Sequence, residues 1–363
     1  MDKAMLLNLR QNDYESRLIS TGNNYPDIDI SKDQLNELCV LLHARVSMDE
    51  IVSLLSISEV DLMQKIDKLR LEGLVKYVNN YFLPTFPIVS EDDGRELYQL
   101  SRKIGQNIVK LICGKMHEIK EETYNIPAFQ KFTFEELSLF MLSDVLLDNF
   151  QIQNVEKLYL KSEKPNRNNK HYFFALLAKN PNSSLEPFGI YGNDYRQMGK
   201  YTYCMYGNSR YNKDQFLTLS TEQLENHFNY SSINIVQSKE LILDRIVEHY
   251  DGDATLPKQI QMGLEKLHLL YNEKLMLPIL NENEYGSLFD IAGVIRDDLI
   301  YILLCYHNDL VNYFSQSLYA EETTYGEFFL WYYHFFYTFV TEELIKSRNI
   351  VLPKGQVFNY MIR

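Results

Sequence analysis

The side chains best suited to chemistry lie in the last third of the sequence, where two histidines stand among carboxylates. His307 lies within the stretch LLCYHNDLVNYF, and His334 follows Glu327 by seven positions, which would place Glu327 and His334 on one face of a helix. Metal sites in helical bundles repeat a Glu-x-x-His pattern, and this region lacks it. We therefore expect both histidines to belong to the core, with no metal and no cofactor.

A second histidine–carboxylate pair lies in the middle of the chain. His117 and Glu121 are four positions apart in HEIKEE, so they would be neighbours on a helix surface. No third ligand is evident, and we expect a solvated, salt-bridging surface. The sequence contains no HExxH, GxSxG, P-loop or GxGxxG motif of the kind that carries enzymatic chemistry. An enzyme with a site among the C-terminal helices is an alternative that no motif requires.

Aromatic side chains crowd the segment FFLWYYHFFYTFV, residues 328–340. They cover nearly every face of the helix that the segment predicts, and such a helix is either buried or lines a pocket. We expect a core helix, because the segment is shorter than the ~18–20 uncharged apolar residues that a membrane span needs. In the alternative, five side chains would line a ligand pocket: Trp331, Tyr333, His334, Tyr337 and His307.

The composition is that of an ordinary globular protein. The 363 residues are 45% hydrophobic and 23% charged, enough for two or three domains with their own cores. The net charge of −13 argues against non-specific coating of nucleic acid, because phosphate affinity comes from clustered lysine and arginine. Four widely spaced cysteines without a CxxC pair favour a reducing, cytoplasmic setting. The N-terminus has no apolar run typical of a signal peptide.

Helix caps and a hairpin signal organise residues 31–89. Ser31, Ser47 and Ser58 each precede a segment with helical apolar spacing, as N-cap residues do. Gly73 is placed to end the third helix. Two β-prone runs then flank Asn79–Asn80, an asparagine pair that tolerates positive φ and predicts a hairpin.

The stretch SMDEIVSLLSISEVDLMQKIDKLRLEGLV with its hairpin resembles the winged helix-turn-helix of bacterial regulators of the MarR and ArsR type. The resemblance covers about a sixth of the chain and implies a recognition helix and a wing that bind double-stranded DNA. The residues that would contact DNA are Gln64, Lys65, Lys68, Lys76, Asn79 and Asn80. It also implies a DNA-binding transcriptional regulator that acts as a homodimer.

Charge weakens the DNA interpretation. Residues 31–89 hold six bases against eight acids, whereas DNA-binding domains are usually basic. Asp61 and Asp67 lie on the outward face of the expected recognition helix and would repel phosphate. The alternative is therefore a protein-interaction or scaffold factor whose winged helix does not bind DNA. The basic segment KSEKPNRNNKHY (161–172) is expected to be a solvated loop between strands.

The rest of the chain predicts an α+β, mainly helical protein. We expect a long linker helix over 90–122, a further helix over 133–151, and a small antiparallel sheet over 155–206. Helices follow near 221–228, 238–250, 257–275, 287–317 and 322–347, and the chain closes with a strand or a docked tail. The predicted parts are an N-terminal arm (1–30), a winged helix-turn-helix (31–89), linker or dimerisation helices (90–152), and a sensing or interaction domain with a C-terminal helical bundle (153–363).

Overall fold

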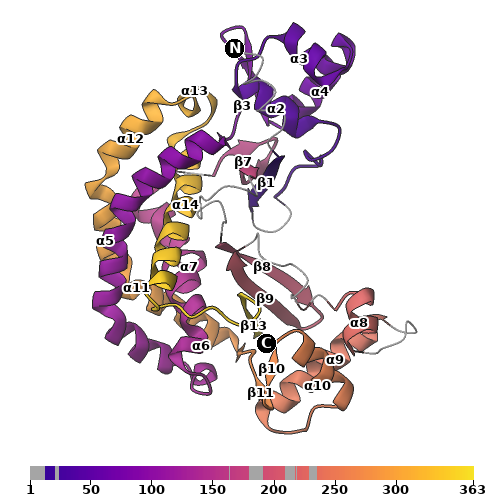
Figure 1. Cartoon of the computed structure of the whole chain (residues 1–363), viewed down its shortest axis with the longest axis vertical. Helices are drawn as coiled ribbons and strands as arrows, with labels where there is room; N and C mark the ends of the chain where they lie inside the picture. The colour runs from indigo at the N-terminus through magenta and orange to yellow at the C-terminus, as the bar shows by residue number, and fades with distance from the viewer. Residues whose placement is uncertain are drawn as a thin grey trace. The chain divides into compact units, whose positions relative to one another are not determined.

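The computed structural model describes residues 13–20, 24–162, 164–179, 191–208, 217, 219–228 and 235–363, and Figure 1 shows the elements along the chain. The described chain is mainly helical with small sheets, which confirms the predicted class. None of its described helices combines the length and the apolar character that crossing a bilayer requires.

Three helices and a hairpin form what we call the first module. The N-caps predicted at Ser47 and Ser58 are confirmed, since their side chains accept from the backbone N–H of Glu50 and Asp61, and each is completed to a capping box. Ser31 is not a cap: its hydroxyl donates to Asp29, and the first helix starts later. The elements are α2 (Leu35–His43), α3 (Met48–Leu55), α4 (Glu59–Leu71), β2 (Val75–Val78) and β3 (Tyr81–Pro84).

The first module continues into a strand and a long helix. Strand β4 (Ile88–Val89) precedes α5 (Glu91–Tyr124), which is unbroken at Gly94. Strand β7 (Phe173–Lys179) pairs parallel with β4 and antiparallel with β1 (Asp13–Ile19). Residues 13–19, which sequence placed in a polar arm, are therefore an edge strand. Tyr14 of this strand packs against the first hydrophobic core.

The middle of the chain is helical up to β7 except for a short hairpin. The helical elements are η1 (Pro127–Phe129), α6 (Phe134–Leu139), the π-helical η2 (Phe140–Val145), α7 (Asn149–Asn154) and the π-helical η3 (Val155–Leu160). The hairpin is β5 (Asn166–Arg167) with β6 (Lys170–His171).

A second set of elements follows. Strands β8 (Tyr191–Met198) and β9 (Tyr201–Asn208) form a hairpin, and β9 also pairs with β13 (Val357–Ile362) at the C-terminus. Between them lie α8 (Thr221–Phe228), α9 (Ile235–Asp251), α10 (Lys258–Lys266), β10 (Leu270–Tyr271), β11 (Lys274–Leu275), β12 (Ile279–Leu280), α11 (Glu282–Cys305), α12 (His307–Gln316), α13 (Tyr319–Glu322) and α14 (Tyr325–Lys346).

The second set repeats the plan of the first. Strand β12 pairs parallel with β13, and β13 pairs antiparallel with β9, as β4, β7 and β1 do. The Leu176 amide donates to the Pro87 carbonyl at 3.1 Å, and the Met361 amide donates to the Pro278 carbonyl at 2.9 Å. We call α9, α10, β10 and β11 the second module.

The correspondence holds at a fixed displacement of 191 positions from Thr85–Glu136 to Met276–Glu327. The Ser90–Asp93 cap of α5 becomes the Asn281–Glu284 cap of α11. Five buried positions of α5 recur on α11 and α12 as buried positions: Leu97 and Leu288, Ile104 and Ile295, Ile108 and Leu299, Ile112 and Leu303, Ile119 and Leu310. A repeated register of this length indicates an internal duplication.

The two compact units of the chain interleave the two copies. Unit 1 comprises Met1–Ile104, Glu156–Phe188 and Ile302–Phe336, and unit 2 comprises Gly105–Val155, Gly189–Tyr301 and Tyr337–Arg363. Each unit thus contains one module, its sheet, and helical segments from the other copy. These units differ from the contiguous parts that sequence predicted, because the chain passes between units within α5, α11 and α14.

Two further expectations need correction. The single sheet over 155–206 is wrong, because 155–160 are helical and the strands that follow belong to different sheets. The helix expected over 257–275 ends at Lys266, and a turn and a hairpin follow. Of the two expectations for the closing segment, the strand is confirmed as β13, which pairs with the distant β9.

Candidate functional site

The outward face of α4 in unit 1, where DNA contacts were predicted, carries both apolar and polar side chains. Val60, Gln64, Asp67 and Leu71 follow one another at helical spacing, so they share a face, and all four are exposed. Val60 is 66% exposed and Leu71 is 75% exposed. The hairpin adds Tyr77, Val78 and Tyr81, which are also exposed.

The basic side chains of α4 contact Asp33, which precedes α2, and Asp67 of α4 itself. Lys65 donates to the backbone carbonyl of Asp33, and Lys68 pairs with the Asp33 carboxylate at 3.3 Å. Arg70 pairs with Asp67 at 3.2 Å. These exposed pairs are weak, but they direct the lysines toward the N-terminal side of α2. The predicted contact residue Gln64 is exposed.

Asp61 has a structural role. Its carboxylate accepts from the Ser58 hydroxyl at 2.7 Å and from the Ser58 amide, closing the capping box of α4. The hydrogen bond from the Ser58 side chain, followed by that from its backbone, lowers the pKa of Asp61. The Asp61 carboxylate, which the sequence placed on the outward face, therefore helps to cap the N-terminus of α4 and remains exposed.

The hairpin turn and its strand place the other predicted contacts differently. Asn79 and Asn80 both adopt positive φ, at 51° and 67°, and are exposed at the tip, as predicted from the asparagine pair. Lys76 is half-buried, and burial is the main cause that lowers its pKa, against the opposing charge of Glu322. Lys76 thus lies beside α13, away from the tip.

Helix α13 packs against the first module through a buried contact between a histidine ring and a carboxylate. The His43 ring lies 2.8 Å from a Glu322 carboxylate oxygen, and Arg45 pairs with Glu321 at 3.1 Å. The Tyr319 hydroxyl donates to the Ile88 carbonyl at 3.2 Å. These polar contacts hold α13 against the first module. Among the described residues, the exposed face of α4 has no hydrogen-bond or ion-pair partner on α13.

Arg167 is buried in unit 1, contrary to the solvated loop expected for residues 161–172. Arg167 is 3% exposed and Glu327 is 1% exposed, and their charged groups lie 2.6 Å apart. The guanidinium also donates to the carbonyls of Thr85 and Tyr172 at 2.7 and 2.8 Å. The other Glu327 oxygen accepts from the Phe174 amide. The pair thus joins the base of the hairpin, β7 and α14.

Four of the five side chains considered for a ligand pocket lie on α14, and His307 packs against Tyr325 of the same helix. Trp331, Tyr333, His334 and Tyr337 are buried, which agrees with a core helix. The His334 Nδ1 lies 2.7 Å from the Leu330 carbonyl, and burial lowers the pKa of His334 to about 4. His307 contacts the Tyr159 hydroxyl at 3.0 Å.

The described residues contain no cluster of three or more His, Cys, Asp or Glu side chains suited to a metal ion. His117 and Glu121 lie 3.8 Å apart on an exposed helix surface. All four cysteines are free thiols.

A buried acid pair lies in unit 2, on and after the π-helical turn η2. Asp144 and Asp148 are both buried. Asn193 donates to one Asp144 oxygen at 2.7 Å. Burial raises the pKa of Asp144 to about 7, and burial with the Asp144 charge raises that of Asp148 well above its usual range. Sequence analysis missed this pair because nothing in the spacing of two aspartates predicts burial.

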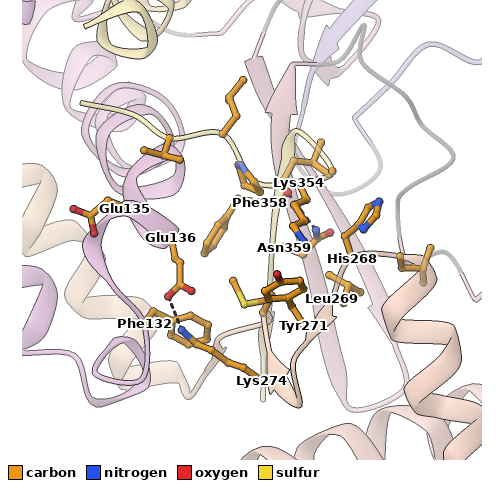
Figure 2. A pocket seen from close by; sticks show the side chains of 17 residues that line it. Phe132, Glu135, Glu136, His268, Leu269, Tyr271, Lys274, Lys354, Phe358 and Asn359 are labelled. Atoms are coloured by element: carbon orange, nitrogen blue, oxygen red, sulfur yellow. Dashed lines mark hydrogen bonds and ion pairs between the residues drawn. The ribbon is translucent and has the colours of Figure 1, made fainter. Parts of the chain in front are cut away.

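Unit 2 also holds a cavity of about 280 Å³ at the base of the second module. Figure 2 shows Glu136 and Lys274 on one side and Lys354 and His268 on the other. Lys274 pairs with Glu136 at 2.6 Å, and Lys354 lies 3.5 Å above the Tyr271 ring. Most of the remaining lining is apolar, including Phe132, Leu267, Leu269, Met276, Val351, Leu352, Pro353, Val357 and Phe358.

No family model, curated protein or solved structure matches this chain.

Proposed function

We propose that the protein is a protein-interaction factor, and that its first module is a winged helix whose recognition helix and wing bind a protein partner. The exposed apolar side chains of α4 and the hairpin carry this proposal. Val60 and Leu71 on α4 and Tyr77 and Tyr81 on the hairpin are each more than half exposed. We infer that they contribute to one interaction surface, since exposed apolar patches of soluble proteins mark interaction sites and aromatic side chains are enriched in protein interfaces.

The charges near this face support a protein rather than a phosphate backbone. Glu59, Asp61 and Asp67 are exposed along α4, while Lys65 and Lys68 are paired with Asp33. Phosphate binding requires free clustered bases. We infer a partner surface that is apolar at its centre and basic at its rim. A second copy of this chain fits poorly, because each copy carries a net charge of −13 and like charges repel.

The internal duplication favours a factor that acts without forming a homodimer. Dimeric winged-helix regulators present two recognition helices by symmetry. Here the second module supplies a second helix and hairpin, α10 with β10 and β11, within one chain. We propose that one chain presents both modules.

A DNA-binding regulator is the second candidate, favoured by one observation. Gln64, Asn79 and Asn80 are exposed at the positions of a recognition helix and a wing tip, and such amides can read adenine or contact the backbone. In this case Lys68 would leave Asp33 for phosphate, at little cost because the pair is exposed.

The deciding experiment introduces a photo-cross-linking amino acid at Val60 in the native cells, with the exposed Tyr301 as control position. We expect a protein cross-link at Val60 that is absent at Tyr301. With the recovered partner purified, Leu71→Asp should weaken binding at least tenfold, about 1.4 kcal/mol, whereas Lys68→Glu should change it little.

The opposite pattern of results would favour the DNA-binding regulator over the protein-interaction factor. That pattern is duplex binding by the full chain that falls steeply with salt, is lost in Lys68→Glu and is unchanged in Leu71→Asp.

A further inference from the structure

The cavity of unit 2 occupies the place that the Arg167 side chain fills in unit 1. In unit 1, three elements meet around the guanidinium: the base of the hairpin, the N-terminal part of α14, and the loop before β7. In unit 2, the cavity is bounded by the base of the second hairpin, the N-terminal part of α6, and the loop before β13. These are the corresponding elements of the duplication.

The match extends to single residues. Gly73 and His268 both end a helix with positive φ and donate to the third residue before them, and the Thr85 and Met276 amides close the two hairpins in the same way. Glu327 and Glu136 each stand three positions after a threonine whose hydroxyl accepts from their amide. Tyr172 and Val357 stand four positions before the paired residues Leu176 and Met361. All four unit 2 counterparts line the cavity: His268, Met276, Glu136 and Val357.

Among the described residues, no guanidinium lines the cavity of unit 2. Nine positions before Leu176 stands Arg167, and nine positions before Met361 stands Leu352, an aliphatic side chain on the cavity wall. The one lysine of that loop, Lys354, lies on the Tyr271 ring. Arg348, the arginine between α14 and β13, is exposed and does not line the cavity, so this loop places no planar cation at the corresponding site.

Lys274 satisfies only part of the corresponding carboxylate. It reaches Glu136 from the hairpin side and binds the Oε2 atom, which also accepts from the Thr133 amide. No hydrogen bond within the described chain reaches the Oε1 atom of Glu136. A lysine is a compact point charge, whereas a guanidinium bridges several acceptors in one plane. In unit 1 Arg167 does this for one carboxylate and two backbone carbonyls.

We propose that this cavity binds a ligand with a planar guanidinium or amidinium group, placed where Arg167 lies in unit 1. The head group pairs with Glu136 and with the backbone carbonyl at Met276. The apolar body of the ligand lies against Phe132, Leu269 and Phe358, and the cavity volume of about 280 Å³ suits a small molecule or one arginine side chain. The site is independent of the interaction proposed for the first module.

The test titrates the full chain with phenylguanidine, and with phenylurea as its neutral counterpart of nearly equal shape. We expect phenylguanidine to bind and phenylurea to bind at least tenfold more weakly. Glu136→Gln should weaken phenylguanidine binding at least tenfold, while the matched variant Glu135→Gln, an exposed acid on the same wall, should change it less than threefold. Val351→Trp, at a half-exposed lining position, should block binding without altering the core.

A parallel titration with N-acetyl-arginine amide distinguishes the two possible sources of the guanidinium group, an arginine side chain and a small molecule. Tighter binding of the arginine derivative assigns the site to an arginine side chain, and tighter binding of phenylguanidine assigns it to a small aromatic molecule. The proposal fails if no guanidinium compound binds, if phenylurea binds equally well, or if Glu136→Gln, shown folded by its circular dichroism, binds phenylguanidine unchanged.

Discussion

Replacing Arg167 with Ala is expected to lower the free energy of unfolding by about 3–5 kcal/mol, because it leaves the buried carboxylate of Glu327 without its cation. Glu327 is 1% exposed, and burial raises its pKa against the opposing effect of Arg167. The variant also leaves the carbonyls of Thr85 and Tyr172 without the guanidinium donor. Urea denaturation of the full chain at neutral pH measures the difference.

Two comparisons isolate the role of burial. Arg70→Ala removes an arginine from an exposed pair with Asp67, and we expect a change below about 1 kcal/mol. The double variant Arg167→Met with Glu327→Leu removes both charges and should regain much of the loss, since apolar replacement of a buried pair is often near neutral. A loss for Arg167→Ala no larger than for Arg70→Ala would contradict the buried pair.

The second large effect concerns the buried Asp144 in unit 2. Asp144→Asn is expected to stabilise the protein at pH 8, on the order of a few kcal/mol, and to have little or no stabilising effect near pH 4. The cause is burial, which raises the folded-state pKa of Asp144 from 3.8 to about 7. Urea denaturation at pH 4 to 8 measures the difference between the variant and the natural chain.

The direction in which stability changes with pH follows from proton binding. Between pH 3.8 and about 7, the folded state binds the Asp144 proton and the unfolded state has released it. The stability that this proton confers is therefore present at low pH and declines as pH rises through this window. An amide cannot ionise, so the variant avoids the cost of a buried charge. The Oδ1 atom of Asn193 has no partner among the described residues, and a proton or amide at position 144 would supply a donor for it.

The neighbouring Asp148 and an exposed aspartate serve as controls. Asp148 titrates together with Asp144, because each charge opposes the other, so Asp148→Asn should shift the pH dependence of stability as well. Asp290→Asn, at an exposed position of α11, should leave the pH profile unchanged. A stability difference for Asp144→Asn that is constant from pH 4 to 8 would refute ionisation as its cause.

Local signals predicted local structure well. The serines before α3 and α4 predicted both N-caps, because a cap needs only its own side chain and the next turn. Asn79–Asn80 predicted the hairpin, because positive φ is a property of the turn residues themselves. The aromatic segment around Trp331 predicted a buried helix from its composition alone.

Pairings between distant segments could not be predicted in the same way. Strand β13 pairs with β9, and β1 pairs with β7, yet no local pattern names a partner far along the chain. The duplication escaped sequence analysis for a related reason. Its two copies share burial and caps more than residue identity, as Ser90 with Asn281 and Ile108 with Leu299 illustrate.

The features of the candidate sites fall into the same two groups, those set by neighbouring residues and those set by contacts between distant segments. By itself the sequence determined the capped starts of α3 and α4, the turn at Asn79–Asn80 and the acidic balance of residues 31–89, since these depend on neighbouring residues and composition. Only the tertiary structure decided that Lys65 and Lys68 point to Asp33, that Arg167 is buried against Glu327, and that unit 2 leaves the corresponding site open. Burial and charge pairing depend on which distant segments meet, and that is set by packing of the whole chain.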